Sequence, residues 1–296
     1  MIGQFAALGA ALAFSVTSTM FTLAGRKFGA SLVMQVSIAI GLLCVFILHW
    51  ITVGQPLPVN ADLKRWLLLG GSAVLGFWLS SLAILNAFIL IGPRLALLIA
   101  TSNPIMSAVL AWVFLGQSLA LISIAGMLLI VLGIIYVITE GRGANSNITP
   151  EAFRLGITYA GGAACLQAVM QIMMAEGMAG DFNPISGNLM RLMVGAVVLW
   201  GLAVMRGDLI SSFQQLRQSP AAMQQLSIGA VAGPVVGASL ILMAFANAPV
   251  GVASILANLQ PVFLIPIGYV VFKERITQRA IAGTFVAMFG AALLFM

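Results

Sequence analysis

The sequence predicts an all-α integral membrane protein, with ten transmembrane helices arranged as two inverted five-helix repeats around a central cavity. Composition, the spacing of apolar runs and a weak internal repeat support this fold class. The chain of 296 residues is 61 % hydrophobic and only 7 % charged, with a mean hydropathy of +1.12. Because soluble domains carry about 25 % charged residues, a water-facing globule is excluded.

The charged residues fall in clusters between long apolar runs. No charged residue occurs in the runs 28–61, 95–139 and 218–272. A helix needs roughly 20 apolar residues to cross the ~30 Å hydrocarbon layer, so each run holds two spans. The net charge of +6 would suggest nucleic acid in a soluble protein. Here the basic residues stand singly or in pairs between apolar segments, which indicates orientation in a bilayer. We expect lipid and a small molecule as partners, and no nucleic acid.

Glycine, proline and charge signals divide the first part of the chain into five helices. These cover about 3–25, 31–51, 66–90, 94–115 and 118–139. The first helix is expected to end at Gly25-Arg26-Lys27, the third at Gly92-Pro93, and Gly116-Gln117 separates the last two.

A polar linker follows, and the same signals predict five further helices. These cover about 152–177, 184–205, 224–246, 250–272 and 277–295. Pro184, Pro249 and the cluster Lys273-Glu274-Arg275 mark their boundaries. The chain therefore divides into a first repeat over residues 1–139, a linker over 140–150 and a second repeat over 151–296.

The two parts are similar at a shift of 157 residues. This shift places Leu85-Asn86-Ala87-Phe88 on Leu242-Met243-Ala244-Phe245, and Asn103-Pro104 on Gln260-Pro261, without gaps. It also places Gly126 on Gly283 and Gly133 on Gly290. A repeat with an odd number of spans must be inverted relative to its copy. Inverted repeats are typical of transporters that bind substrate between their halves.

Lys and Arg in the loops predict the orientation, because they accumulate on the cytoplasmic side. One side has only Lys64 and Arg65. The other side has ten basic residues: Arg26, Lys27, Arg94, Arg142, Arg154, Arg206, Arg217, Lys273, Arg275 and Arg279. We therefore expect both termini to be non-cytoplasmic, in a bacterial-type inner membrane.

Polar residues within the first and sixth predicted helices are candidate cavity residues, because polar groups in hydrocarbon need a partner or a wet cavity. Ser15 and Thr19 share one helix face with Ser18 and Thr22. Close helix packing would explain these hydroxyls equally well. Gln167 and Gln171 lie four residues apart among methionines. They favour a cavity with a deformable apolar wall, although a glutamine pair that bridges to a neighbouring helix remains an alternative.

The repeat-related pairs Asn103-Pro104 and Gln260-Pro261 predict a kink in each half, because proline removes a helical hydrogen bond. Pro104 and Pro261 are the predicted hinges, and Asn258 lies near the second pair. Broken helices at matched positions of two halves point to a transporter site. A purely structural kink is the competing explanation.

Arg191 is the one charged residue placed inside a predicted span. Its side chain either extends to the interface as an anchor or meets a carboxylate or phosphate in a cavity. Asn188 precedes it by one helical turn, and Trp78 and Ser81 are expected to line the same space.

Acidic residues are absent from the interior of the predicted spans, where Asp and Glu fall only at ends or in loops. This disfavours exchange of a proton against a cation. No Walker motif, metal cluster or set of catalytic residues is found, so we expect no enzyme activity and no cofactor. Cys44 and Cys165 both lie in apolar runs, which disfavours a disulfide framework.

The chain resembles the EamA-type branch of the drug/metabolite transporter superfamily. The resemblance rests on Asn103-Pro104 to Gln117 with Gly126 and Gly133, and on Gln260-Pro261 to Thr277 with Gly283 and Gly290. One departure is visible: Glu274 has Gln117 as its counterpart, where the family often has an acidic residue in both halves. The resemblance implies a ten-helix basket whose cavity opens alternately to either side.

Together these observations predict a carrier that exports or exchanges small metabolites, most plausibly amino acids, by facilitated diffusion or exchange. Hydroxyl and amide groups would bind the polar end, and Arg191 the carboxylate. The alternative is a multidrug or lipid-precursor efflux carrier of the same fold. Monomer and homodimer both remain open.

Overall fold

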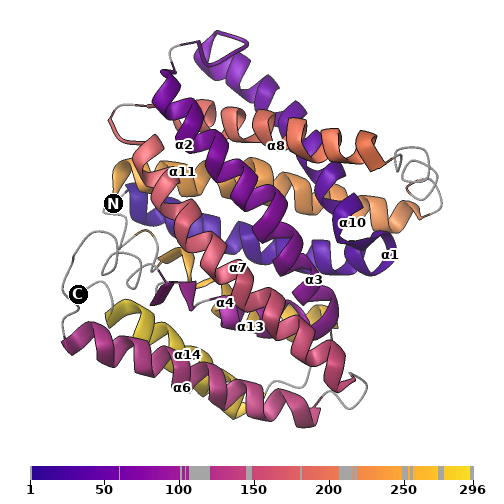
Figure 1. The fold of residues 1–296 in the computed structure, drawn as a ribbon, viewed down its shortest axis with the longest axis vertical. Coiled ribbons are helices and arrows are strands. Elements are labelled where there is room, and N and C mark those ends of the chain that lie inside the picture. Colours follow the sequence, from indigo (N-terminus) through magenta and orange to yellow (C-terminus); the bar gives the residue numbers. More distant parts are fainter. Residues whose placement is uncertain are drawn as a thin grey trace.

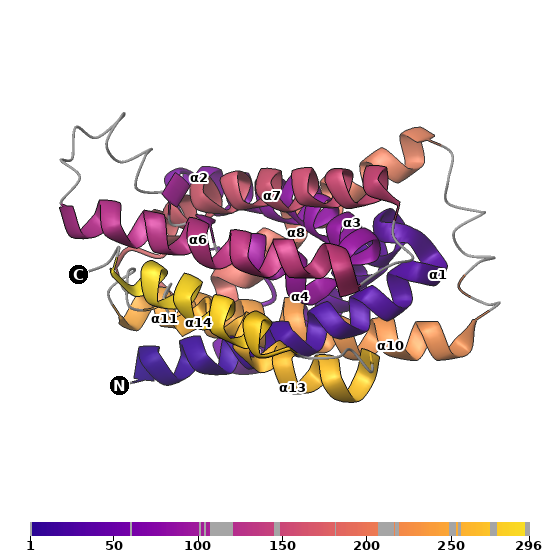
Figure 2. The same ribbon diagram turned by 90° about the horizontal axis from the view of Figure 1, so that it is seen from below.

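The computed structural model describes residues 2–59, 61–100, 102–103, 105–106, 121–144, 149–180, 182–206, 216, 219–248, 253, 256–272 and 277–293. All the elements assigned within these residues are helical. The N- and C-terminal ends lie on the same side of the molecule, at the left of Figures 1 and 2.

The first element, α1 (Ile2–Val53), contains two helices joined at Gly29. Gly29 has φ 75° and ψ 162°, a conformation that is open to glycine because it has no Cβ. The predicted break at Gly25-Arg26-Lys27 is therefore wrong by several residues. Gly25 stays helical and packs closely on the helix that contains Ile89, since a Cβ on Gly25 would lie 3.2 Å from Ile89 Cδ1.

The next apolar stretch is continuous, with a wider turn in its middle. It consists of α2 (Leu63–Ala73), the π-helix η1 (Val74–Ser80) and α3 (Ser81–Ile91). Asp62 caps α2 by accepting a hydrogen bond from Arg65 N at 3.1 Å. Gly92 (φ 82°) ends α3, and α4 (Pro93–Ala100) follows.

The remaining helices are the last helix of the first half, followed by the helices of the second half in the same order as in the first. They are α6 (Leu121–Ala144), α7 (Pro150–Gly177), α8 (Pro184–Arg206), α10 (Pro220–Ala230), η2 (Val231–Gly237), α11 (Ala238–Asn247), α13 (Gln260–Phe272) and α14 (Gln278–Leu293). α6 continues into the predicted linker, and the predicted ninth helix is broken before Gln260.

Five helical stretches among the described residues are long and apolar enough to cross a membrane: Ile2–Val53, Leu63–Ile91, Pro150–Gly177, Pro184–Met205 and Pro220–Asn247. The first contains both of the first two predicted helices. Half of the predicted fourth helix, including Pro104, lies outside the described residues. The predicted total of ten helices is therefore not established by the described part of the chain.

The shift of 157 residues reappears in the backbone. The first and last residues of α2 and α10 differ by this shift, and so do those of η1 and η2. The first residues of α3 and α11 differ by the same shift. Pro234 explains the wider turns of η2, because a proline inside a helix cannot donate its hydrogen bond. η1 has no proline, but both π-helices contain a glycine at the matched positions 76 and 233.

The repeated glycines bring α6 and α14 together, and these helices lie side by side in Figures 1 and 2. A Cβ on Gly133 would lie 2.6 Å from Gly283 O, and a Cβ on Gly290 would lie 2.6 Å from Gly126 O. The same four glycines that mark the repeat in sequence thus allow the two backbones to approach, as small residues do between membrane helices.

The first helix of each half packs against the third helix of the other half. The third helix is the continuous stretch α2–η1–α3 in the first half and α10–η2–α11 in the second half. α1 contacts α10, η2 and α11, whereas α7 contacts α2, η1 and α3. The second helices follow the same rule: a Cβ on Gly41 would lie 2.8 Å from Pro234 Cβ, and one on Gly195 would lie 2.8 Å from Phe77 Cδ2. The two halves are therefore interlocked around a common centre.

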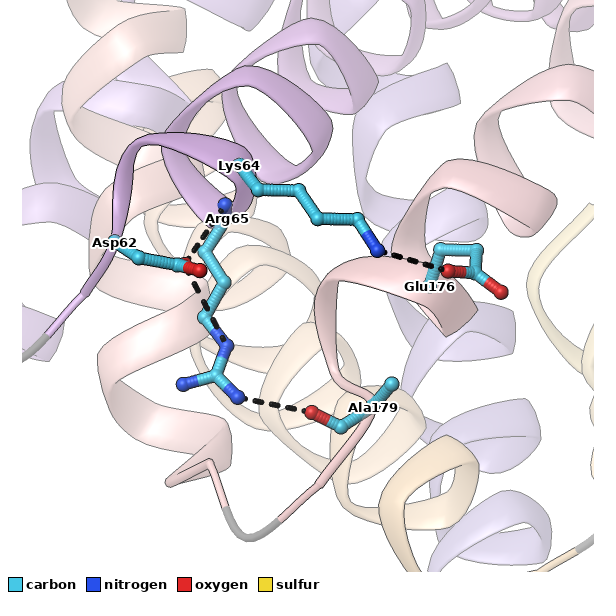
Figure 3. A network of polar contacts seen from close by, with 5 residues as sticks. All are labelled: Asp62, Lys64, Arg65, Glu176 and Ala179. Atoms are coloured by element: carbon cyan, nitrogen blue, oxygen red, sulfur yellow. Dashed lines mark hydrogen bonds and ion pairs between the residues drawn. The ribbon is translucent and has the colours of Figure 1, made fainter.

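A polar network joins the start of α2 to the end of α7 (Figure 3). Lys64 Nζ lies 3.5 Å from Glu176 Oε2, and both side chains are more than half exposed. Arg65 donates a hydrogen bond to Ala179 O at 2.9 Å, and its guanidinium lies 4.5 Å from the centre of the Phe182 ring. These contacts link the two halves at the side that has few basic residues.

Candidate functional site: a cavity between the two halves

A cavity of about 260 Å³ lies where α1, α7, α8 and the two π-helices meet. Both halves contribute to its wall, and most of the wall is apolar. Polar groups reach it from α7, α8, η1, α3 and the turn that precedes α13.

The α1 and α7 walls present repeat-related residues. Each wall uses the i, i+3, i+4, i+7 positions that share one helix face. The α1 wall consists of Phe14, Thr17, Ser18 and Phe21; the α7 wall consists of Gln167, Met170, Gln171 and Met174. Each pair of counterparts is separated by 153 residues. The two walls therefore occupy equivalent places with different chemistry.

Arg191, on α8, points its guanidinium into this cavity and is only 4 % exposed. Its Nε donates to Ser72 Oγ at 3.1 Å, and Ser72 in turn donates to Leu69 O at 2.7 Å. The guanidinium carbon lies 5.0 Å from the centre of the Phe77 ring, and Nη2 lies 3.7 Å from Met170 Sδ. The surroundings fix the orientation of the cation but supply no compensating charge.

No acidic side chain lines the cavity among the residues that the structure describes. An isolated buried charge is unfavourable by several kcal/mol, and such groups inside a membrane are usually paired or functional. Arg191 is thus a cation held by neutral groups, with room for an anionic ligand beside it.

Two glycines let α7 and α1 approach the π-helices at the cavity. A Cβ on Gly76 would lie 2.5 Å from Met170 Sδ, and one on Gly233 would lie 2.6 Å from Thr17 Cγ2. Met170 and Thr17 are themselves repeat-related, so the two close approaches are counterparts.

A helix break supplies the polar groups near α13. Leu259 N donates to Leu256 O at 3.2 Å, and its counterpart Ser102 N donates to Ile99 O at 3.0 Å. Asn258 lies in this break and lines the cavity, and its Nδ2 has no hydrogen-bond partner in the part of the chain that the structure describes. The interruption of the ninth predicted helix therefore falls at the cavity.

The predicted hinges have a different geometry from the one expected. Pro261 is the second residue of α13, a position where proline removes no interior hydrogen bond, so it does not kink a continuous helix. Pro104 lies outside the described residues. The prolines inside described helices are Pro234 in η2 and Pro266 in α13.

Six of the predicted site residues line the cavity: Ser81, Gln167, Gln171, Arg191, Asn258 and Gln260. Ser15 and Thr19 do not. The Ser15 hydroxyl lies 2.7 Å from Ala11 O and 3.1 Å from Gln260 O, and the Thr19 hydroxyl donates to Ser15 O at 2.9 Å. These two hydroxyls therefore serve helix packing, the alternative that the sequence left open.

Three further predicted residues lie outside the cavity. Trp78 packs against the main hydrophobic cluster, while its neighbour Phe77 lines the cavity. Asn188 donates to Pro234 O at 2.8 Å and to Ser239 Oγ at 3.0 Å, which anchors η2. Asn103 is 2 % exposed and its Oδ1 has no hydrogen-bond partner among the described residues, but the side chain does not line the cavity.

Sequence reasoning missed several lining residues. The shift of 157 residues does not lead to Phe14 and Thr17, because their structural counterparts Gln167 and Met170 lie 153 residues further along the chain. The pair Gly233-Pro234, which also lines the cavity, could have predicted the helix distortion at η2 from the sequence. Nothing in the sequence indicates η1, which was missed together with Phe77 and Ser80.

Comparison with known proteins adds a family assignment. The sequence model of the EamA-like transporter family matches residues 1–139 and 154–296. One solved crystal structure has the same fold, with a TM-score of 0.68 over 98 % of this chain and 95 % of the other, at 15 % identity. No curated protein matches the chain.

Proposed function

We propose a substrate class for this chain, which belongs to the EamA-like transporter family and is therefore a multi-pass membrane transporter of small molecules. The proposed substrates are small amphipathic metabolites that present a carboxylate, with amino acids as the expected class. The protein would export or exchange them across a bacterial-type inner membrane.

The uncompensated charge of Arg191 carries this proposal. A guanidinium presents a planar fork of donors that matches a carboxylate. Because its partners Ser72, Phe77 and Met170 are neutral, a bound carboxylate would supply the missing charge. The unpartnered Asn258 Nδ2 and the amides of Gln167 and Gln171 would complete the polar end of the site.

The size of the cavity favours small metabolites over drugs. Pockets for drug-sized ligands measure roughly 300–1,000 Å³, and this cavity measures about 260 Å³. The aromatic and methionine side chains of its wall would hold the apolar part of the substrate. A multidrug or lipid-precursor carrier would need a larger cavity or an opening between helices.

The duplicated architecture supports transport by alternating access. In the proposed arrangement ten spans form two inverted repeats, and both termini are non-cytoplasmic. The halves would rock about the cavity, with the helix breaks near residues 102 and 259 and the π-helices as the deformable points. Without an acidic group among the described lining residues, we expect facilitated diffusion or exchange.

Counterflow in proteoliposomes tests this function. Vesicles preloaded with an unlabelled amino acid mixture should accumulate external radiolabelled amino acid without an ion gradient. Arg191→Gln should abolish this accumulation, whereas a lipid-facing change such as Val197→Leu should not. Wild-type protein that is folded but inactive with every carboxylate-bearing metabolite would exclude the proposed class.

A further inference from the structure

We infer that the cavity selects ligands with one net negative charge: an apolar body with a carboxylate, without an ammonium group. The inference rests on the proposed function, because it concerns the substrate of the same site. It narrows that proposal by ranking the carboxylate-bearing substrates: metabolites that are anions as a whole would bind more tightly than amino acids, which remain weaker substrates.

Counting charge at the cavity gives the first argument. The described lining residues carry one cation, Arg191, and no anion. A bound zwitterion leaves the net charge of the occupied cavity unchanged at one positive unit, whereas a bound monoanion brings it to zero. Since an unbalanced charge is costly in a low-dielectric site, the monoanion gains the larger stabilisation.

The ammonium of a zwitterion also lies near the guanidinium. The two substituents of an α-amino acid share one carbon, so a carboxylate bound to Arg191 holds the ammonium nearby. Like charges at short range oppose binding by several kcal/mol. No described acidic residue lines the cavity to offset this repulsion.

The hydroxyls of the cavity can accept a hydrogen bond from a ligand. Thr17, Ser18 and Ser80 each donate their proton to a backbone carbonyl, at 2.9, 2.9 and 3.3 Å, so their oxygens present lone pairs to a ligand. An ammonium or a hydroxyl of the ligand could donate to these oxygens, but only the hydroxyl does so without adding a positive charge to the cavity of Arg191. A 2-hydroxy acid therefore keeps this hydrogen bond and remains a monoanion.

The apolar body has a defined place. The wall on α1 presents Phe14 and Phe21, and α11 adds Ile241 and Phe245. The apolar body would bind against these side chains while the carboxylate binds at Arg191. This division requires an amphipathic anion rather than a small inorganic one.

A matched set of ligands with one phenyl ring tests the inference. The competitors are 3-phenyllactate (anion), phenylalanine (zwitterion) and phenethylamine (cation). Each is measured for its inhibition of the counterflow of a radiolabelled amino acid. We expect phenyllactate to inhibit at a concentration about tenfold lower than phenylalanine, and phenethylamine to be inactive. Stronger inhibition by phenylalanine than by phenyllactate would overturn the inference and leave the proposed function intact. Inactivity of both carboxylates would overturn both.

A charge-swap variant makes the test specific for electrostatics. Gln171→Glu adds one negative charge to the cavity, so zwitterion binding then leaves it neutral and anion binding leaves it negative. We expect the preference to reverse toward phenylalanine, while Gln171→Met, which removes the amide without adding charge, keeps the wild-type order. An unchanged order in the Glu variant would contradict the inference. Gln167→Glu, one helical turn away, replaces it if Gln171→Glu does not fold.

Discussion

The α1 and α7 walls of the cavity occupy equivalent positions in the two halves, yet their chemistry differs. Where α1 presents Phe14 and Ser18, α7 presents Gln167 and Gln171. The backbone that supports them is duplicated, down to two π-helices at a shift of 157 residues. The two walls thus have matching positions but different side chains: the α7 wall carries two amides, and the α1 wall carries hydroxyls and aromatic rings.

The second helices show the same contrast. Both second helices have a glycine where they contact the other half: Gly41 lies against Pro234, and Gly195 lies against Phe77. Arg191, by contrast, aligns with Ser37 when these glycines are superposed. A carrier that moves by exchanging the roles of its halves needs matched backbones, but a single amphipathic ligand needs an asymmetric cavity.

Removal of the Arg191 charge should give the largest effect. Arg191→Gln should weaken transport at least about thirtyfold, because the loss of one partner of a buried charge pair costs about 2–5 kcal/mol. Thermal unfolding of the ligand-free protein should occur at an equal or higher temperature, since the variant removes an uncompensated buried charge. A marked drop in unfolding temperature would instead indicate a structural role.

The glycines of the π-helices should respond unequally to an added methyl group. Gly233→Ala would meet Thr17 Cγ2, which is short and branched, and should cost about 1–3 kcal/mol of stability. Gly76→Ala would meet the flexible end of Met170, which can move, so its cost should be smaller. Unfolding in detergent measures both. Equal losses of stability in the two variants would contradict this prediction, because they would mean that Met170 is as rigid as Thr17.

Loss of one amide on the polar wall should have a moderate effect. Gln171→Leu should weaken substrate binding about threefold to tenfold, the equivalent of one hydrogen bond. Asn103→Leu is the control, because Asn103 is buried but does not line the cavity. The measurement is the rate of counterflow as a function of the substrate concentration. This dependence should change in Gln171→Leu and stay the same in Asn103→Leu. A matching change in the second would place Asn103 in the site.

The network of Figure 3 should give the smallest effect. Lys64→Ala removes one exposed ion pair and should lower the free energy of unfolding by less than about 1 kcal/mol. Arg65→Ala also removes the bond to Ala179 O and the contact with Phe182, so its loss should be larger. The reverse order would show that the exposed pair is the stronger link between the halves.

Periodicity and repetition in the sequence were sufficient to predict much of the fold. An all-helical membrane protein, the shift of 157 residues and the place of Arg191 within a helix all follow from apolar runs and from single unusual residues. Helix ends were less predictable. The chain breaks at Gly29 rather than at Gly25, because only the tertiary packing of Gly25 on Ile89 distinguishes the two glycines.

Among the candidate site residues, tertiary structure decided which hydroxyls and amides reach the cavity. Ser15 and Ser18 lie on nearly the same helix face, but Ser15 is covered by the break before α13 while Ser18 is open to the cavity. Asn188 is turned onto Pro234 by a distortion that local sequence does not reveal.

Composition by itself therefore determined that the chain is a membrane protein, because too few charges exist to cover a surface in water, and repetition determined its duplicated plan. Which face of each helix lines the cavity was decided only by tertiary structure. In a uniformly apolar helix every face is compatible with lipid, and only the neighbouring helices select the one that turns inward.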